Sequence, residues 1–168
     1  MPNLPPDAAC AAAPRAPAQL NGTLGGMGCA VPPSQENRMV PIRLAPGSDI
    51  RRTLEDALAT ASPDSAFVLA GIGSLVQAVL RYAGAGADTV VPGPLEILSI
   101  SGSLSQAGAH LHMTVSDASG RVVGGHVSYG NTVRTTAEIL LVPLRDWSLT
   151  REHDPATGYK ELVVRRSE

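Results

Sequence analysis

The sequence predicts an α+β domain with a central, mostly antiparallel sheet and one main helix. From residue 39 onward, most of the chain consists of short segments rich in Val, Ile, Leu and Thr, separated by Gly, Pro, Asp and Ser. Only residues 50–61 repeat apolar side chains at the spacing of an amphipathic helix. Aromatic residues make up 3% of the chain, so its core has to be built from Val, Leu, Ile and Ala. Many strands beside a single helix are typical of an α+β domain with antiparallel strand pairing.

Residues 1–37 are expected to form a disordered Pro/Ala-rich head, followed by one domain over residues 38–168. The head holds seven of the fourteen prolines, and such a segment cannot bury enough apolar surface to offset its ordering entropy. Cys10 and Cys29 match no metal or redox spacing, which indicates a reducing compartment. The start lacks the pattern of a secretory signal, and no apolar run is long enough to span a bilayer. A cytoplasmic protein without a membrane partner is therefore expected.

The first elements of the domain are a strand and the helix. Residues 39–44 (MVPIRL) have the composition of a strand. A Pro-Gly turn follows, and Ser48 or Asp49 is a suitable N-cap for the helix. The expected apolar stripe of the helix contains Ile50, Leu54, Ala57, Leu58 and Ala61. A helix with one such stripe is expected to lie on one face of the sheet.

Five further strands are expected besides a central hairpin. They are residues 65–73, 75–83, 95–104, 135–144 and 161–166. Gly71-Ile72-Gly73 is interpreted as a turn that ends the first of these strands. It lacks both the third glycine of a dinucleotide-binding loop and the Lys-Ser or Lys-Thr of a phosphate loop. DPATGY (154–159) is interpreted as the turn before the last strand.

Residues 110–126 (HLHMTVSDASGRVVGGH) form the predicted central hairpin. Asp117-Ala118-Ser119-Gly120 favours a type I turn followed by a left-handed glycine. If Asp117 pairs with Arg121, Val115 lies opposite Val123 and His112 opposite His126. This register separates an apolar face from a polar one. The apolar face carries Leu111, Met113, Val115, Val123, Val127 and Tyr129, and the polar face carries His110, His112, Thr114, Ser116, Gly124, His126 and Ser128.

Three of the four histidines therefore meet on the polar face of this hairpin. His110 and His112 are about 6.5–7 Å apart along one strand, and His112 and His126 oppose each other at about 4.5–5.5 Å. Three imidazoles can hold a zinc ion and leave a fourth position for water or a substrate. The alternative is three solvated histidines on the outer face of a hairpin. The fourth histidine, His153, lies outside the cluster.

Four charged residues within apolar strands are candidates for supporting this site or for binding a partner. They are Glu96, Glu138, Arg43 and Arg81. A carboxylate beside a metal ligand can orient that ligand or act as a general acid or base. The alternative places each of these side chains on the solvent side of its strand, where the arginines could pair with the glutamates.

The charge balance disfavours autonomous binding to nucleic acid. The formal net charge is −2, and outside the head the chain has 12 basic and 13 acidic residues. A protein that grips a phosphate backbone usually carries a basic patch that is visible in its composition. The few aromatic residues also make a stacking platform for bases unexpected.

Four segments of the sequence resemble the PPC ("plants and prokaryotes conserved") domain over roughly residues 38–165. They are GPLEILSISGSLS, HLHMTVSDASGRVVGGHV, TAEILL and REHDPATGYKEL. The resemblance implies a stand-alone prokaryotic member that assembles as a homotrimer around a central antiparallel sheet. Plant members of this family carry an Arg-Gly-Arg-Pro AT-hook for DNA, which this sequence lacks, so DNA binding is expected to be weak or indirect. Their partner-binding Gly-Arg-Phe-Glu-Ile-Leu segment is GPLEIL (93–98) here.

The PPC fold is also similar to that of acetolactate decarboxylase, a zinc enzyme whose metal is held by three histidines. This resemblance implies that His110, His112 and His126 are zinc ligands. The leading hypothesis is a DNA-binding or regulatory module, or a module for other protein partners, with a three-histidine metal site and without enzymatic activity. The alternative is a zinc-dependent lyase or hydrolase acting on a small carbonyl substrate. An open pocket that receives Glu96, Glu138 or an arginine would favour the enzyme.

Overall fold

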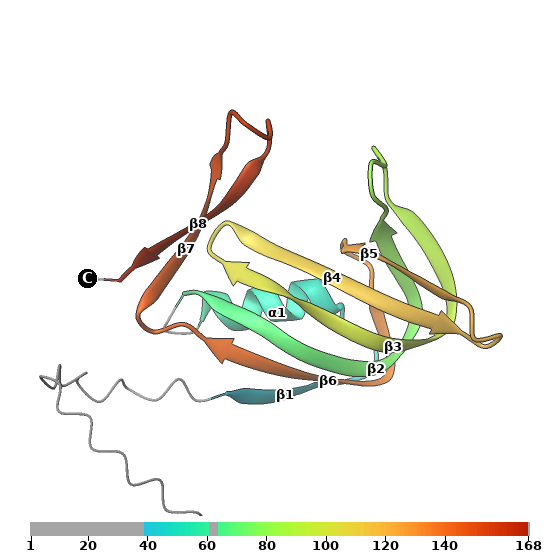
Figure 1. Cartoon of the computed structure of the whole chain (residues 1–168). Helices are drawn as coiled ribbons and strands as arrows, with labels where there is room; N and C mark the ends of the chain where they lie inside the picture. Colours follow the sequence, from blue (N-terminus) through green and yellow to red (C-terminus); the bar gives the residue numbers. More distant parts are fainter. Residues whose placement is uncertain (1–38, 61–63, 168) are drawn as a thin grey trace, which may run out of the picture. The chain divides into compact units, whose positions relative to one another are not determined.

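The computed structural model describes residues 39–60 and 64–167 (Figure 1). The predicted head therefore lies outside the described residues. The elements follow in the order β1 (Val40–Leu44), α1 (Ile50–Ala59), β2 (Ala66–Arg81), β3 (Thr89–Ser105), β4 (Gly108–Asp117), β5 (Val122–Val127), β6 (Thr132–Pro143), β7 (Trp147–His153) and β8 (Lys160–Arg166). No helix of the described residues is long and apolar enough to cross a membrane.

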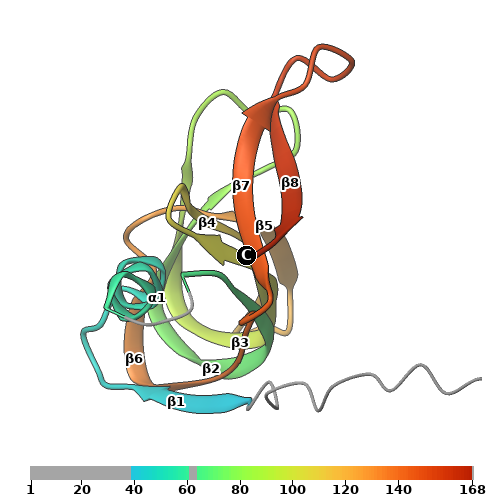
Figure 2. The same ribbon diagram turned by 90° about the vertical axis from the view of Figure 1, so that its left-hand side faces the viewer.

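Six of the strands form one antiparallel sheet in the order β1-β6-β2-β3-β4-β5. β5 pairs with β4 and also with the end of β2, at Leu80 and Arg81. Because of this second pairing, the sheet closes on itself at one end, and Figure 2 shows the resulting curvature. The predicted α+β class, with a mostly antiparallel sheet and one helix, is confirmed.

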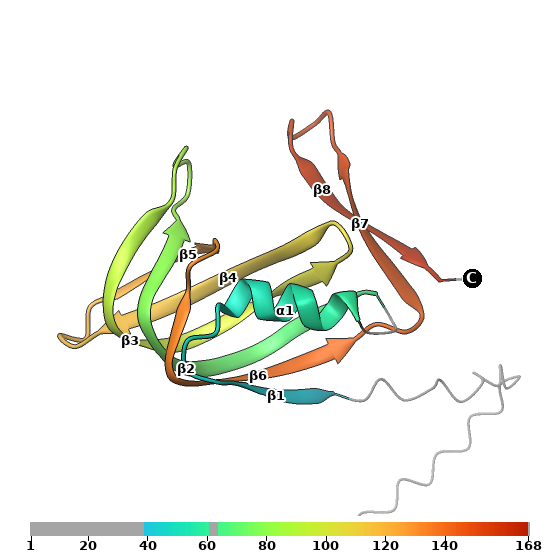
Figure 3. The same ribbon diagram turned by 180° about the vertical axis from the view of Figure 1, so that it is seen from behind.

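The helix covers one face of the sheet (Figure 3), and its buried side chains belong to the hydrophobic core. Asp49 is the N-cap, and its carboxylate accepts a hydrogen bond from the backbone N–H of Arg52 at 3.0 Å. Ile50, Leu54 and Leu58 are buried and face β3, β4 and β6. Ala57 is exposed, so the buried stripe is narrower than predicted, and Ala61 lies outside the described residues.

The two strands predicted at 65–73 and 75–83 are one continuous strand, β2, so the turn predicted at Gly71-Ile72-Gly73 is wrong. These glycines allow neighbouring strands to approach closely instead. Gly73 has a φ of +149°, and a Cβ atom there would lie 2.4 Å from the carbonyl oxygen of Thr136. The register of β2 against β6 shifts beside Gly73, which is the behaviour of a β-bulge.

The C-terminal segment forms a second, two-stranded sheet. β7 pairs with β8 from Trp147–Arg166 to His153–Lys160. The turn predicted over residues 154–159 is confirmed, since the N–H of Asp154 donates to the carbonyl of Tyr159 at 2.8 Å. The last strand was predicted, whereas β7 was not. Figures 1 and 3 show this hairpin rising from the end of β6 beside the larger sheet.

Candidate metal centre

The hairpin of β4 and β5 has the predicted register. Val115 pairs with Val123 and His112 with His126. The turn fixes this register, because the N–H of Asp117 donates to the carbonyl of Arg121 at 3.0 Å and Gly120 takes a φ of +78°. Hydrogen bonds from the hydroxyl of Ser119 and the N–H of Arg121 lower the pKa of Asp117 to about 2.

The two faces of the hairpin are separated as the alternation predicts. Leu111, Met113 and Val115 are buried in the core beneath the sheet. His112 is exposed on the opposite side, and His110 and His126 are half-buried. Tyr129, placed on the apolar face by the sequence, lies beyond the end of β5 and is half exposed. Its hydroxyl donates to Glu55 on the helix at 2.7 Å.

The three imidazole rings form one compact cluster. The ring centroid of His112 lies 5.1 Å from that of His110 and 4.4 Å from that of His126, and the other two rings are 5.3 Å apart. One ligating nitrogen from each ring lies within 4.8 Å of the others. Zinc binds imidazole nitrogen at about 2.0–2.1 Å, so small side-chain rotations would bring the three nitrogens to one ion. The donor set therefore fits zinc or another metal that prefers imidazole.

Arg81 is the one predicted supporting residue that the structure places at the cluster. It ends β2 directly opposite His126, and directly paired residues share a face of the sheet. Burial lowers the pKa of His126 below its usual 6.5, and the positive charges of Arg81 and His112 lower it further. A lowered pKa keeps the imidazole neutral, which is the form that binds a metal.

A second arginine, Arg151, reaches the cluster from β7. Its Nη2 lies 2.5 Å from Nδ1 of His110, and its Nη1 donates to the carbonyl of Lys160 at 3.2 Å. Burial and then the charge of Arg151 lower the pKa of His110, whereas Glu161 acts in the opposite direction. Arg151 is not among the site residues predicted from the sequence. The alternating segment WSLTREH could have indicated a strand there, but no local signal indicates which histidine the arginine meets.

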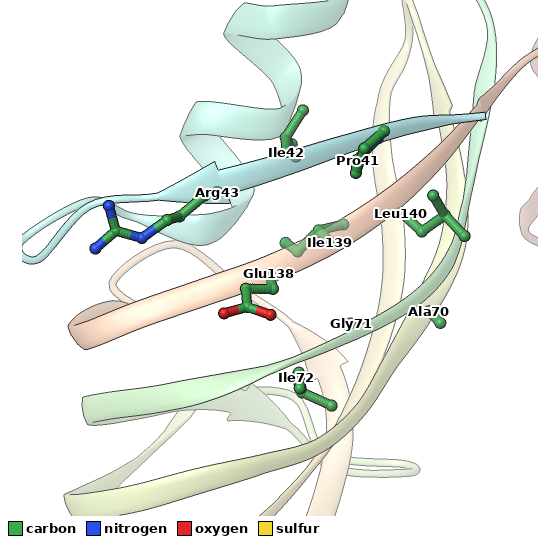
Figure 4. Close-up of a pocket in the computed structure, with 9 residues that line it drawn as sticks. All are labelled: Pro41, Ile42, Arg43, Ala70, Gly71, Ile72, Glu138, Ile139 and Leu140. Carbon is green, nitrogen blue, oxygen red and sulfur yellow. The ribbon is translucent and has the colours of Figure 1, made fainter. Parts of the chain in front are cut away.

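The other three predicted supporting residues lie away from the histidines. Glu96 is exposed and sits opposite Ser116 on β4, whereas His112 sits opposite Ser101. Arg43 on β1 and Glu138 on β6 are register neighbours beside an apolar groove of about 450 Å³ (Figure 4). Arg43 donates to the hydroxyl of Thr136 at 3.1 Å, and no salt bridge joins Arg43 to Glu138 in the described part of the chain.

Comparison with known families gives one match that covers most of the chain. The Plants and Prokaryotes Conserved (PCC) domain matches residues 32–145. A curated relative, the "Bifunctional protein GlmU" of Synechococcus sp. (strain JA-3-3Ab), is 43% identical over 134 residues. That alignment covers 80% of this chain but only 22% of the relative, so the chain spans about a fifth of that protein's length.

Several solved structures share the fold, and three of them follow. A hypothetical protein from Salmonella cholerae-suis is 36% identical with a TM-score of 0.74, and the match covers 77% of this chain and 94% of that one. A metal-containing protein from Archaeoglobus fulgidus is 27% identical with a TM-score of 0.65, over 75% and 93% of the two chains. A protein from Ralstonia eutropha JMP134, provisionally described as DNA-binding, is 25% identical with a TM-score of 0.62, over 73% and 89%.

Proposed function

Because the chain belongs to the Plants and Prokaryotes Conserved domain family, we propose that it is a metal-binding module of that family. His110, His112 and His126 are the proposed ligands, and zinc is the proposed ion. The observation that carries this proposal is the convergence of three imidazoles from two strands on one face. The similarity to a metal-containing protein from Archaeoglobus fulgidus supports it. When bound, such an ion would supply a Lewis-acidic position at the surface of the sheet.

We propose a binding or regulatory role for the module rather than catalysis. Neither Glu96 nor Glu138 reaches the histidines, so the carboxylates expected to act as general acid or base lie elsewhere. A zinc-dependent lyase or hydrolase acting on a small carbonyl substrate is the second candidate. The observation that favours it is the guanidinium of Arg151 beside His110, together with the exposure of His112.

Weak or indirect DNA binding and assembly as a homotrimer belong to the same proposal. The domain after the head carries 12 basic and 13 acidic residues, which supports little attraction to a phosphate backbone. Apolar side chains on the outward face of the sheet support self-association, since Leu69, Ile72 and Leu98 are each more than half exposed.

Metal content and thermal stability of histidine variants test the metal site. We expect purified wild-type protein to hold about one metal ion per chain and to melt at a lower temperature after treatment with a chelator. His112→Ala should lose most of the metal and most of the chelator effect. Because His112 is exposed, the variant should still fold.

His153→Ala is the matched control for this experiment. His153 ends β7 opposite Lys160 and is exposed, and it lies outside the cluster. The metal content of the His153→Ala variant, and the change in its melting temperature on adding chelator, should equal those of the wild type. Equal metal content in the wild type and His112→Ala, or a wild type indifferent to chelator, would leave the histidines as a polar hairpin face.

A further inference from the structure

Two arginines, Arg81 and Arg151, lie beside the histidine cluster. Arg151 is half-buried and contacts His110 and the backbone carbonyl of Lys160. Arg81 is also half-buried and faces His126. Among residues 39–60 and 64–167, neither arginine forms a salt bridge. Partly buried guanidinium groups usually pair with an anion, so these two are available to a ligand.

A metal ion and Arg151 cannot both use His110. A neutral imidazole has one nitrogen that carries a proton and one that carries a lone pair. A guanidinium only donates, so its contact with Nδ1 occupies the lone pair and leaves the proton on Nε2. If His110 bound a metal through Nδ1, the metal would replace Arg151. If His110 bound the metal through Nε2, its proton would move to Nδ1 and point at the guanidinium of Arg151, which also only donates. Ligation therefore displaces Arg151 in either tautomer.

The displaced guanidinium would lie next to a strongly positive centre. Metal-binding imidazoles are neutral, so they do not balance the charge of a divalent ion. Arg81 and Arg151 add two further positive charges at His126 and His110. Within the part of the chain that the structure describes, Glu161 is the acidic residue whose charge acts on His110, and its carboxylate already accepts from the hydroxyl of Thr157 at 3.0 Å. A divalent ion held by the three histidines would therefore make this a net positive site that could take a further, anionic ligand.

We propose that this site binds a small oxyanion, which completes the coordination of the metal and is held by Arg151 and Arg81. This inference rests on the proposed metal-binding function. The planar fork of a guanidinium matches the two oxygens of a carboxylate or phosphate group, and both kinds of anion also suit a divalent metal. Arg151 then exchanges its contact with His110 for a charge-assisted contact with the anion.

Anion titrations of the cobalt-loaded full-length protein test this inference, because the visible absorption of cobalt(II) changes with its coordination. Acetate and inorganic phosphate, added at constant ionic strength, are the two probes. We expect a saturable change in the cobalt spectrum of the wild type with at least one probe. The probe with the higher affinity identifies the class of oxyanion. Arg151→Gln should weaken that binding by about 10-fold or more, the loss expected for a charge-assisted hydrogen bond. Arg81→Gln should weaken it as well.

Arg165→Gln is the matched control, since it removes the same charge from the same hairpin. Arg165 pairs with Glu152 on the exposed side, and its variant should bind the anion as the wild type does. Arg151→Gln should also bind cobalt at least as tightly as the wild type, because a competitor for His110 has been removed. An unfolded variant would not combine weaker anion binding with cobalt binding as tight as that of the wild type.

The possible failures are distinguishable. If the wild type binds no cobalt, the proposed metal function fails and the inference fails with it. If cobalt binds but neither probe gives a saturable change, the site does not take an oxyanion. If the anion affinity is the same in the wild type and Arg151→Gln, the arginine does not hold the ligand.

Discussion

Glu55 joins the helix to the strand that carries two of the histidines. Its Oε1 accepts hydrogen bonds from the N–H of Ala109 at 2.9 Å and from Nε of Arg51 at 3.0 Å. Its Oε2 accepts from the hydroxyl of Tyr129 at 2.7 Å. Burial alone would raise the pKa of Glu55, but these hydrogen bonds outweigh it and lower the pKa below 4.5.

Glu55→Gln should therefore reduce stability in a pH-dependent manner. A carboxyl group with a lowered folded-state pKa stabilises the fold above its unfolded pKa, and this stabilisation is lost as the pH falls through the folded pKa. We expect Glu55→Gln to lower the free energy of unfolding by about 1 kcal/mol at neutral pH, with a smaller difference below about pH 4. Urea unfolding at several pH values measures this.

Asp56→Asn is the control for this measurement, because it removes the same charge from an exposed position of the same helix. Its free energy of unfolding should stay close to that of the wild type. If Glu55→Gln lowered the free energy of unfolding by the same amount from pH 7 to pH 3, the ionised form of Glu55 would not be the source of the stabilisation.

The histidine cluster was predictable from the sequence because its determinants are local. The turn from Asp117 to Gly120 sets the register, and the two-residue period of a strand then places the three histidines on one face. Arg151 was not predictable, because its contact with His110 depends on where the C-terminal hairpin packs. Glu96 and Glu138 lie within apolar stretches of the sequence, but both side chains are exposed, and these stretches did not indicate how far either carboxylate lies from the histidines.

The length of β2 shows how tertiary packing overrides a local turn signal. Gly71-Ile72-Gly73 has the composition of a turn, yet the strand continues through it. The reason is the close approach of β6, where a Cβ at Gly73 would lie 2.6 Å from the Cα of Ala137. A sequence reveals that glycine is present but does not reveal which strand lies beside it.

Gly73→Ala should destabilise the fold strongly. The added methyl group would overlap the backbone of β6, and the φ of +149° is unfavourable for alanine. We expect a loss of about 2–4 kcal/mol in the free energy of unfolding, from overpacking and backbone strain together. Thermal or urea unfolding would measure it.

Gly86→Ala provides the comparison, since no atom lies within 4 Å of a Cβ at that position in the loop between β2 and β3. Its stability should change by less than about 0.5 kcal/mol. Similar stabilities for the two variants would mean that β6 does not approach Gly73 as described.

The outward face of the sheet leads to a prediction about the assembled molecule. Leu69, Ile72, Val76 and Leu98 project from β2 and β3 with exposed fractions of 56%, 58%, 53% and 51%. Several large apolar side chains exposed on one sheet are typical of an interface. We expect light scattering on the full chain to give three times the mass of one chain.

Ile72→Glu should shift this assembly towards the monomer, because it would bury an unpaired charge in the proposed interface. Because the side chain of Ile72 is exposed in the single chain, the fold of the monomer should tolerate the change. Tyr159→Ser is the control, since Tyr159 is 74% exposed in the turn between β7 and β8. A wild type that is monomeric at micromolar concentration would contradict the trimer.

Anomalous scattering from crystals of the zinc-loaded full-length protein would show directly whether the three histidines hold the ion. Data collected above and below the zinc absorption edge locate the ion independently of any variant. We predict one strong peak per chain, between the rings of His110, His112 and His126, with Arg151 withdrawn from Nδ1 of His110. A zinc peak at another position, or no peak at these three histidines while Arg151 keeps its contact with His110, would contradict it.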